Sequence, residues 1–164
     1  KARAFDFTTK GILQEAVKEK EYWRLRSRDG NAAGVLGWWP ERSVTFLDNH
    51  DTGSKQSHWP FPSDDVLEGY AYILTHPGTP TIFWDHYFEW GDFYRAKIRE
   101  LSEMRHGLNI HRESNLQILE ARNNLYVAKV DDKLILKLGS LGFDPGSEWE
   151  SAISGPGYYI WVRK

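Results

Sequence analysis

The sequence predicts an α/β protein in which part of a parallel βα fold is followed by a small antiparallel β-sheet. Residues 1–107 repeat the order strand, loop, helix three times, and this alternation is typical of parallel βα units. Residues 108–164 instead hold five short strand segments separated by turns rich in Asn, Asp, Gly and Pro, which indicates an antiparallel sheet. We therefore place a domain boundary near residue 108. No Ser/Gly-rich linker marks it, so we expect the two parts to pack directly.

In the first part, the expected strands are short apolar runs over residues 4–7, 43–47 and 80–84. We expect Thr8 and Thr9 to cap the first helix, and Ser63 to cap an amphipathic second helix that stops at His76-Pro77-Gly78. A third helix should end near Gly107, and the charged, Gly-rich residues 24–37 predict a loop. Three βα units cannot close a barrel, which needs eight, so this part is expected to belong to a larger fold.

In the second part, each expected strand is a short run of alternating or continuous apolar residues bounded by turn residues. The expected strands are residues 116–121, 125–130, 134–138, 149–153 and 158–162.

The composition excludes several classes of function. A net charge of -2 gives no reason to expect a nucleic-acid partner, and no apolar run approaches the ~20 residues that span a bilayer. No secretory signal is expected at the start, and the absence of cysteine excludes disulfides and thiolate metal sites. The eight Trp residues favour either sugar binding or a Trp-rich core, because Trp is costly to expose without a packing or binding role.

Asn49-His50-Asp51 is the segment that best suggests chemistry. It follows an expected buried strand and opens a long irregular loop, and functional groups of parallel βα folds cluster at the carboxyl ends of strands. An acid and an imidazole there could serve catalysis or ligand binding. The alternative is a structural turn, in which Asp51-Thr52-Gly53 forms an Asx-type turn.

The segment Phe46-Leu47-Asp48-Asn49-His50-Asp51 resembles the fourth conserved region of the alpha-amylase superfamily, at the end of barrel strand seven. Further segments in the same order resemble the plant-type branch: AFDFTTKGIL (4–13), GWWP (37–40), DTGS (51–54), WPFPS (59–63), GYAYILTHPG (69–78) and DH (85–86). The resemblance implies that residues 1–107 are units six to eight of a (β/α)8 TIM barrel, and that residues 108–164 are the family's five-stranded C-terminal β-sheet domain. It is weakest after residue 139.

The same resemblance implies retaining endo-hydrolysis of alpha-1,4-glucosidic bonds in starch and related glucans. The nucleophilic Asp and the acid/base Glu of the family would precede residue 1, so we expect the fragment alone to be inactive. Asp51 matches the carboxylate that stabilises the transition state, and His50 matches a histidine that donates a hydrogen bond to the same sugar. Trp59 would stack on a sugar, and Gln56 would bind hydroxyl groups. Trp38 and Trp39 would form a starch-binding platform away from the active site.

Alternatives stay open for these aromatic residues and for the function. Trp59 could instead wedge against Pro60 and Phe61, and one of Trp38 and Trp39 could lie in the core. The whole chain could be a non-catalytic carbohydrate-binding or interaction module that uses the three Trp rings.

The expected partners are starch or maltooligosaccharides and the missing N-terminal part of the barrel, with no nucleic acid and no membrane. The resemblance implies calcium for the complete enzyme, but no metal ligand is expected in this chain. A plastid location is favoured over secretion by the segments TTKGILQEAV (8–17) and YWRLR (22–26).

Overall fold

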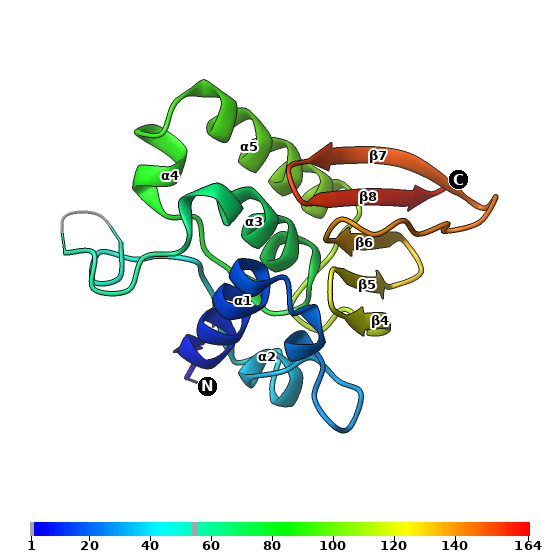
Figure 1. The fold of residues 1–164 in the computed structure, drawn as a ribbon, viewed down its shortest axis with the longest axis horizontal. Helices are drawn as coiled ribbons and strands as arrows, with labels where there is room; N and C mark the ends of the chain where they lie inside the picture. The colour runs from blue at the N-terminus through cyan, green and yellow to red at the C-terminus, as the bar shows by residue number, and fades with distance from the viewer. Residues whose placement is uncertain (1, 54–55) are drawn as a thin grey trace.

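Two sheets organise the chain in the computed structural model, which describes residues 2–53 and 56–164 (Figure 1). The first sheet is parallel and has the strand order β1-β2-β3. Its strands are β1 (Ala4–Phe5), β2 (Ser43–Thr45) and β3 (Thr79–Pro80). Each strand is followed along the chain by a helix, as the alternating pattern predicts. The helical segments are α1 (Phe7–Glu19), η1 (Tyr22–Leu25), α2 (Val35–Trp38), η2 (Ser63–Asp65), α3 (Val66–Thr75), α4 (Trp84–Phe88) and α5 (Asp92–Gly107).

The second sheet is antiparallel, with the order β4-β5-β6-β8-β7. All five strands that the sequence predicts are present, and their ends differ from the predicted ones by two residues at most. They are β4 (Leu116–Arg122), β5 (Leu125–Val130), β6 (Leu134–Leu138), β7 (Trp149–Gly155) and β8 (Tyr158–Arg163). Asn124, Asp131 and Asp132 adopt positive φ values of 61°, 51° and 51° in the turns between them. Asn and Asp tolerate this left-handed conformation better than other residues with a side chain, which is why turn composition located the strands.

Both predicted caps are wrong. The cap of α1 is Asp6, whose Oδ1 accepts a hydrogen bond from Thr9 N at 2.8 Å, while Thr8 and Thr9 lie inside the helix. Asp6 Oδ2 also accepts hydrogen bonds from Leu36 N and Ser43 Oγ, both at 2.8 Å. The carboxylate thereby joins helices α1 and α2 to strand β2, a task for which the shorter Thr hydroxyl has too few acceptor sites. Ser63 begins the 3₁₀ segment η2, and α3 starts one turn later without a side-chain cap.

Two other predictions for the first part need correction. The expected loop over residues 24–37 contains the end of η1 and all of α2 but its last residue, Trp38. The expected strand over residues 80–84 shrinks to β3, because Trp84 already begins α4. In both places an apolar or aromatic run packs as a single helical turn, which periodicity over so few residues cannot distinguish from a strand or a loop.

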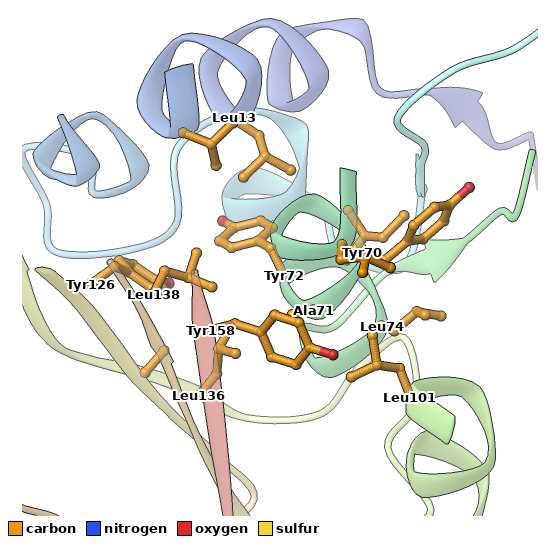
Figure 2. Packing of buried hydrophobic residues seen from close by; sticks show 14 of the residues in the cluster. Leu13, Tyr70, Ala71, Tyr72, Leu74, Leu101, Tyr126, Leu136, Leu138 and Tyr158 are labelled. Carbon is orange, nitrogen blue, oxygen red and sulfur yellow. The ribbon is translucent and has the colours of Figure 1, made fainter. Parts of the chain in front are cut away.

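Helix α3 lies at the centre of the fold, between α1, α5 and the antiparallel sheet (Figure 1). All ten of its residues are buried, so the apolar stripe predicted for this helix lies in the core, and the remaining faces of the helix are covered as well. Figure 2 shows Tyr72 of α3 near Leu13 of α1 and facing Tyr126 of β5, while Tyr158 of β8 approaches α3 further along, beside Leu136. The two parts of the chain therefore share one hydrophobic core.

The core contains Tyr, Leu, Ile and Val but no Trp. All eight Trp residues lie in the described ranges, and none of them is buried. Six have at least 37% of their surface exposed. The interpretation of the Trp content as a Trp-rich core is therefore wrong.

Candidate functional site

His50 and Asp51 lie together on the loop that follows β2. The side chains are 83% and 58% exposed, and His50 Nε2 is 3.3 Å from Asp51 Oδ1. An Asx-type turn is present, but Asn49 forms it: its Oδ1 accepts hydrogen bonds from Asp51 N at 2.9 Å and Thr52 N at 3.0 Å. The Asp51 carboxylate is thus not used by the turn and faces outward, where it can accept hydrogen bonds from a ligand.

The side chain of Asp48 forms hydrogen bonds to both ends of this loop. Its buried carboxylate accepts a hydrogen bond from Thr52 Oγ1 at 2.9 Å, and Phe61 N donates to both of its oxygens at 3.1–3.2 Å. Trp59 N also donates to Thr52 O at 3.1 Å. The start and the end of the loop are therefore held side by side, which fixes where Asp51 and Trp59 emerge.

His86, from the segment after β3, completes the support of Asp48. Its Nε2 is 3.4 Å from Asp48 Oδ2, and its Nδ1 is 2.9 Å from Tyr70 OH. Tyr70 OH accepts a hydrogen bond from Phe83 N at 3.1 Å, so its own proton is available for His86 Nδ1. With Nδ1 accepting from Tyr70, Nε2 of His86 can donate toward Asp48 Oδ2. A cavity of about 640 Å³ borders this network and is lined in part by Asp85, Trp90 and Phe83.

Trp59 lies on the α1 side of the same loop, 38% exposed. The Lys10 ammonium stands 4.3 Å from the centroid of its ring and donates a hydrogen bond to Trp59 O at 2.9 Å. Of its two predicted neighbours, Phe61 is buried in the core and Pro60 is exposed. The ring thus rests on α1, not in a wedge between Pro60 and Phe61. Gln56 is exposed in a turn of the same loop.

Trp38 and Trp39 are separated from this group, because they precede β2 whereas His50 and Asp51 follow it. The two residues are 69% and 64% exposed, so neither lies in the core. Trp39 O accepts hydrogen bonds from Arg42 N and Ser43 N at 2.9 and 3.1 Å, which fixes the backbone that presents the pair at the start of the strand.

Sequence reasoning did not single out Lys10 or predict a role for His86 in this site. Lys10 offered one usable signal: it precedes Leu13 by three positions and Val17 by seven, and so falls on the buried stripe of α1. A lysine on such a stripe needs a specific partner. Burial lowers the pKa of Lys10 to about 8, and the nearby Asp48 carboxylate opposes that shift.

Within residues 2–53 and 56–164, no three His, Asp or Glu side chains gather into a group that could hold a metal ion. The calcium that the resemblance implies for a complete enzyme stays a prediction. In the same ranges, no helix combines the length and the apolar character needed to cross a membrane.

The chain thus combines parallel βα units, which present an acid, an imidazole and an exposed Trp at a strand end, with an antiparallel sheet that packs on them, an arrangement compatible with a βα-type glycoside hydrolase. Residues 106–162 match the family model described as the alpha-amylase C-terminal beta-sheet domain. The chain is 52% identical to the alpha-amylase type B isozyme of Hordeum vulgare, over 93% of this chain and 99% of that sequence. The chain belongs to the alpha-amylase family, and the predicted plant-type resemblance is confirmed.

Two further comparisons show how much of a longer relative the chain covers. The chain is 55% identical to Probable alpha-amylase 2 of Arabidopsis thaliana over 98% of its own length, but it spans only 39% of that relative. The solved structure of CldA, a cyclomaltodextrin glucanotransferase, superposes with a TM-score of 0.65 at 17% identity, over 98% of this chain and 44% of that one. This second likeness shows a shared fold.

Proposed function

We propose that the chain is part of a retaining endo-hydrolase of alpha-1,4-glucosidic bonds in starch and related glucans. In this function Asp51 stabilises the transition state and His50 binds the same sugar. The observation that carries the proposal is the exposed His50–Asp51 pair at the end of β2, left available because Asn49 satisfies the turn and Asp48 fixes the loop.

The chemistry requires two further carboxyl groups about 5–5.5 Å apart, a nucleophile and an acid/base. Both would come from the rest of a longer protein, of which residues 1–107 form barrel units six to eight. Asp51 would accept hydrogen bonds from sugar hydroxyls, and these bonds must strengthen as the ring flattens and positive charge develops. Trp59 would stack on a neighbouring sugar and Gln56 would bind its hydroxyls.

The remainder of the barrel is the proposed partner of strand β1. Among the residues that the structure describes, β1 pairs with β2 alone, on one side. Phe5 in this strand and Phe7 shortly after it are 52% and 47% exposed, which is costly for large apolar side chains in water. Because the nucleophile and the acid/base would both come from the remainder of the barrel, we expect the isolated 164-residue chain to release no reducing sugar from soluble starch.

A non-catalytic carbohydrate-binding module is the second candidate function. Trp38 and Trp39 favour it, because two adjacent exposed rings at the opposite end of β2 suit the faces of a glucan without any nearby acid–imidazole pair. This surface and the strand-end site can also coexist in one enzyme.

The decisive experiment is Asp51→Asn in the full-length protein, with kcat measured on soluble starch. We expect a loss of at least ~10²–10³-fold, as is typical when a preorganised transition-state contact is removed. Asp29→Asn, an exposed acid on a distant turn, is the matched control and should keep the wild-type kcat. An unchanged kcat in Asp51→Asn would remove Asp51 from the mechanism. Starch binding that survives in both variants but is lost in Trp38→Ala/Trp39→Ala would assign that function to the second surface.

A further inference from the structure

Lys10 is a cation buried under the loop that carries Trp59. Its side chain has no exposed surface, and it lies in α1 on the face that packs into the core. Removing an ammonium from water is costly unless hydrogen bonds and a counter-charge replace the lost hydration. Lys10 Nζ donates to Gln14 Oε1 at 2.6 Å and to Trp59 O at 2.9 Å, and it stands 3.9 Å from Asp48 Oδ1.

Two of these contacts act on one residue. The ammonium holds the backbone carbonyl of Trp59, and it also stands 4.3 Å from the centroid of the indole ring, within cation–π range. The other ring within reach, that of Phe61, is 5.9 Å away. Lys10 therefore restrains both the backbone and the side chain of Trp59.

Gly11 supports the ring from the helix surface. A Cβ atom at this position would lie 2.8 Å from Cη2 and 3.1 Å from Cζ2 of Trp59, closer than carbon atoms can approach without a shift. The indole therefore rests directly on the α1 backbone. With the hydrogen bond from Trp59 N to Thr52 O, four contacts fix this residue, two on its backbone and two on its partly exposed ring.

We infer that Lys10 is a positioning residue: it holds Trp59 in the orientation that stacks on a glucan bound beside Asp51. The inference rests on the proposed function. Because Lys10 has no exposed surface, it touches no substrate and acts through Trp59. Its charge matters, because the neutral amine loses most of the cation–π attraction.

The test compares full-length variants by KM and kcat on maltoheptaose. Lys10→Met keeps the length of the side chain and removes the charge, and should raise KM roughly 10-fold, as loss of one cation–π contact and one charged hydrogen bond suggests. The kcat should change by less than about threefold, because Asp51 is held by Asn49 and Asp48. Lys10→Arg, which keeps the charge, should recover part of the lost affinity.

Gly11→Ala perturbs the same ring without touching any charge. It should also raise KM. Because Ala is a better helix former than Gly, this rise cannot be attributed to a weakened α1 helix. Lys18→Met, on the exposed face of α1, is the matched control and should behave as wild type.

The dependence of KM on pH distinguishes a role of Lys10 in positioning Trp59 from a role in overall stability. The groups that face Lys10 are Asp48, with His86 behind it, and the neutral Gln14. Since the pKa of Lys10 is lowered to about 8, its ammonium is present below that pH and lost above it. The wild-type KM should therefore rise above pH 8, and this rise should be absent in Lys10→Met.

Three outcomes would overturn the inference. Lys10→Met could match Lys18→Met in KM, or it could lower kcat and the melting temperature at unchanged KM, which a purely structural role predicts. Trp59→Ala could also leave KM unchanged. Failure of the proposed function is distinguishable, because it requires full activity in Asp51→Asn, a variant that leaves Lys10 and Trp59 intact.

Discussion

Asp48 and Glu68 are both buried carboxylates, but the donors around them differ. Asp48, under the strand-end loop, receives hydrogen bonds from Thr52 and Phe61 N and faces Lys10 and His86. Glu68 of α3, at the boundary with the antiparallel sheet, accepts hydrogen bonds from Tyr22 OH and from Lys20 Nζ, the latter at 3.3 Å.

The cation beside Glu68 is shared. Lys20 also pairs with Asp65 at 2.7 Å and is 41% exposed, so water screens part of its charge. Burial accordingly raises the pKa of Glu68 to about 7, although Tyr22 and Lys20 oppose that shift. The comparison teaches that two buried carboxylates of one chain can be held by different sets of partners. Asp48 has two hydrogen-bond donors, a buried ammonium and an imidazole around it, whereas Glu68 shares a partly exposed lysine with Asp65.

The largest expected effect comes from removing the Asp48 carboxylate. Asp48→Leu leaves Lys10 buried without a counter-charge and Phe61 N without an acceptor, and breaking a buried charge pair in this way costs about 3–5 kcal/mol. Urea unfolding of the full-length protein measures the loss. Asp48→Asn is the control, because its amide oxygen can still accept from Phe61 N, and it should be clearly less damaging. Equal losses in the two variants would show that the charge has no role.

The second largest loss of stability is expected from Gly157→Ala, in the turn between β7 and β8. This substitution probes the cluster around Glu68. Gly157 has a φ of 77°, and an added Cβ would overlap the Glu68 carboxylate. The left-handed backbone alone costs about 1–2 kcal/mol for a residue with a side chain. Gly146→Ala is a matched control, since its φ is 91° but no heavy atom lies within 4 Å of the added carbon. The extra destabilisation of Gly157→Ala over Gly146→Ala isolates the contact with Glu68, and no difference would contradict that contact.

Neither cluster could be predicted from the sequence, although much of the fold could. The five antiparallel strands follow from alternation over a few residues and from Asn, Asp and Gly in the turns, which are local signals. The position of Asp51 at a strand end is local in the same sense. In contrast, Lys10 and Trp59 are 49 positions apart, and Glu68 meets Tyr22 across 46. Only the packing of α1 and α3 brings these residues together, and helical periodicity does not reveal which partner a buried lysine or glutamate will find.

The third prediction concerns how the stability of the folded protein changes with pH. The pKa of Glu68 is about 7 in the folded protein, above its ordinary value of 4.5, so the folded state binds a proton more strongly between these values. The stability from this group is fully present below about pH 4.5 and is lost as the pH rises through 7. Lys20, Tyr22, Asp65 and Lys137 face Glu68, and a change in any of them would alter this window.

Glu68→Gln removes the titration and keeps the size of the side chain. Melting temperatures measured from pH 5 to 8 should therefore fall less steeply in the variant than in wild type, by a few degrees over the range. Parallel curves for wild type and Glu68→Gln would show that Glu68 does not titrate there.

The smallest expected effect sets the scale for the others. Arg99 and Glu103 form a pair on successive turns of α5 at 3.8 Å, with side chains 63% and 72% exposed. Pairs of this kind are worth about 0.3–0.5 kcal/mol, because water and salt screen them. Glu103→Gln should therefore lower the free energy of unfolding by no more than that, and 0.5 M salt should abolish the difference. Asp48→Leu should remain strongly destabilising in the same salt, because ions cannot reach a carboxylate that is almost fully buried. If salt reduced both effects equally, Asp48 would be acting as a surface charge, and the contrast between donor-rich and donor-poor buried carboxylates would not hold.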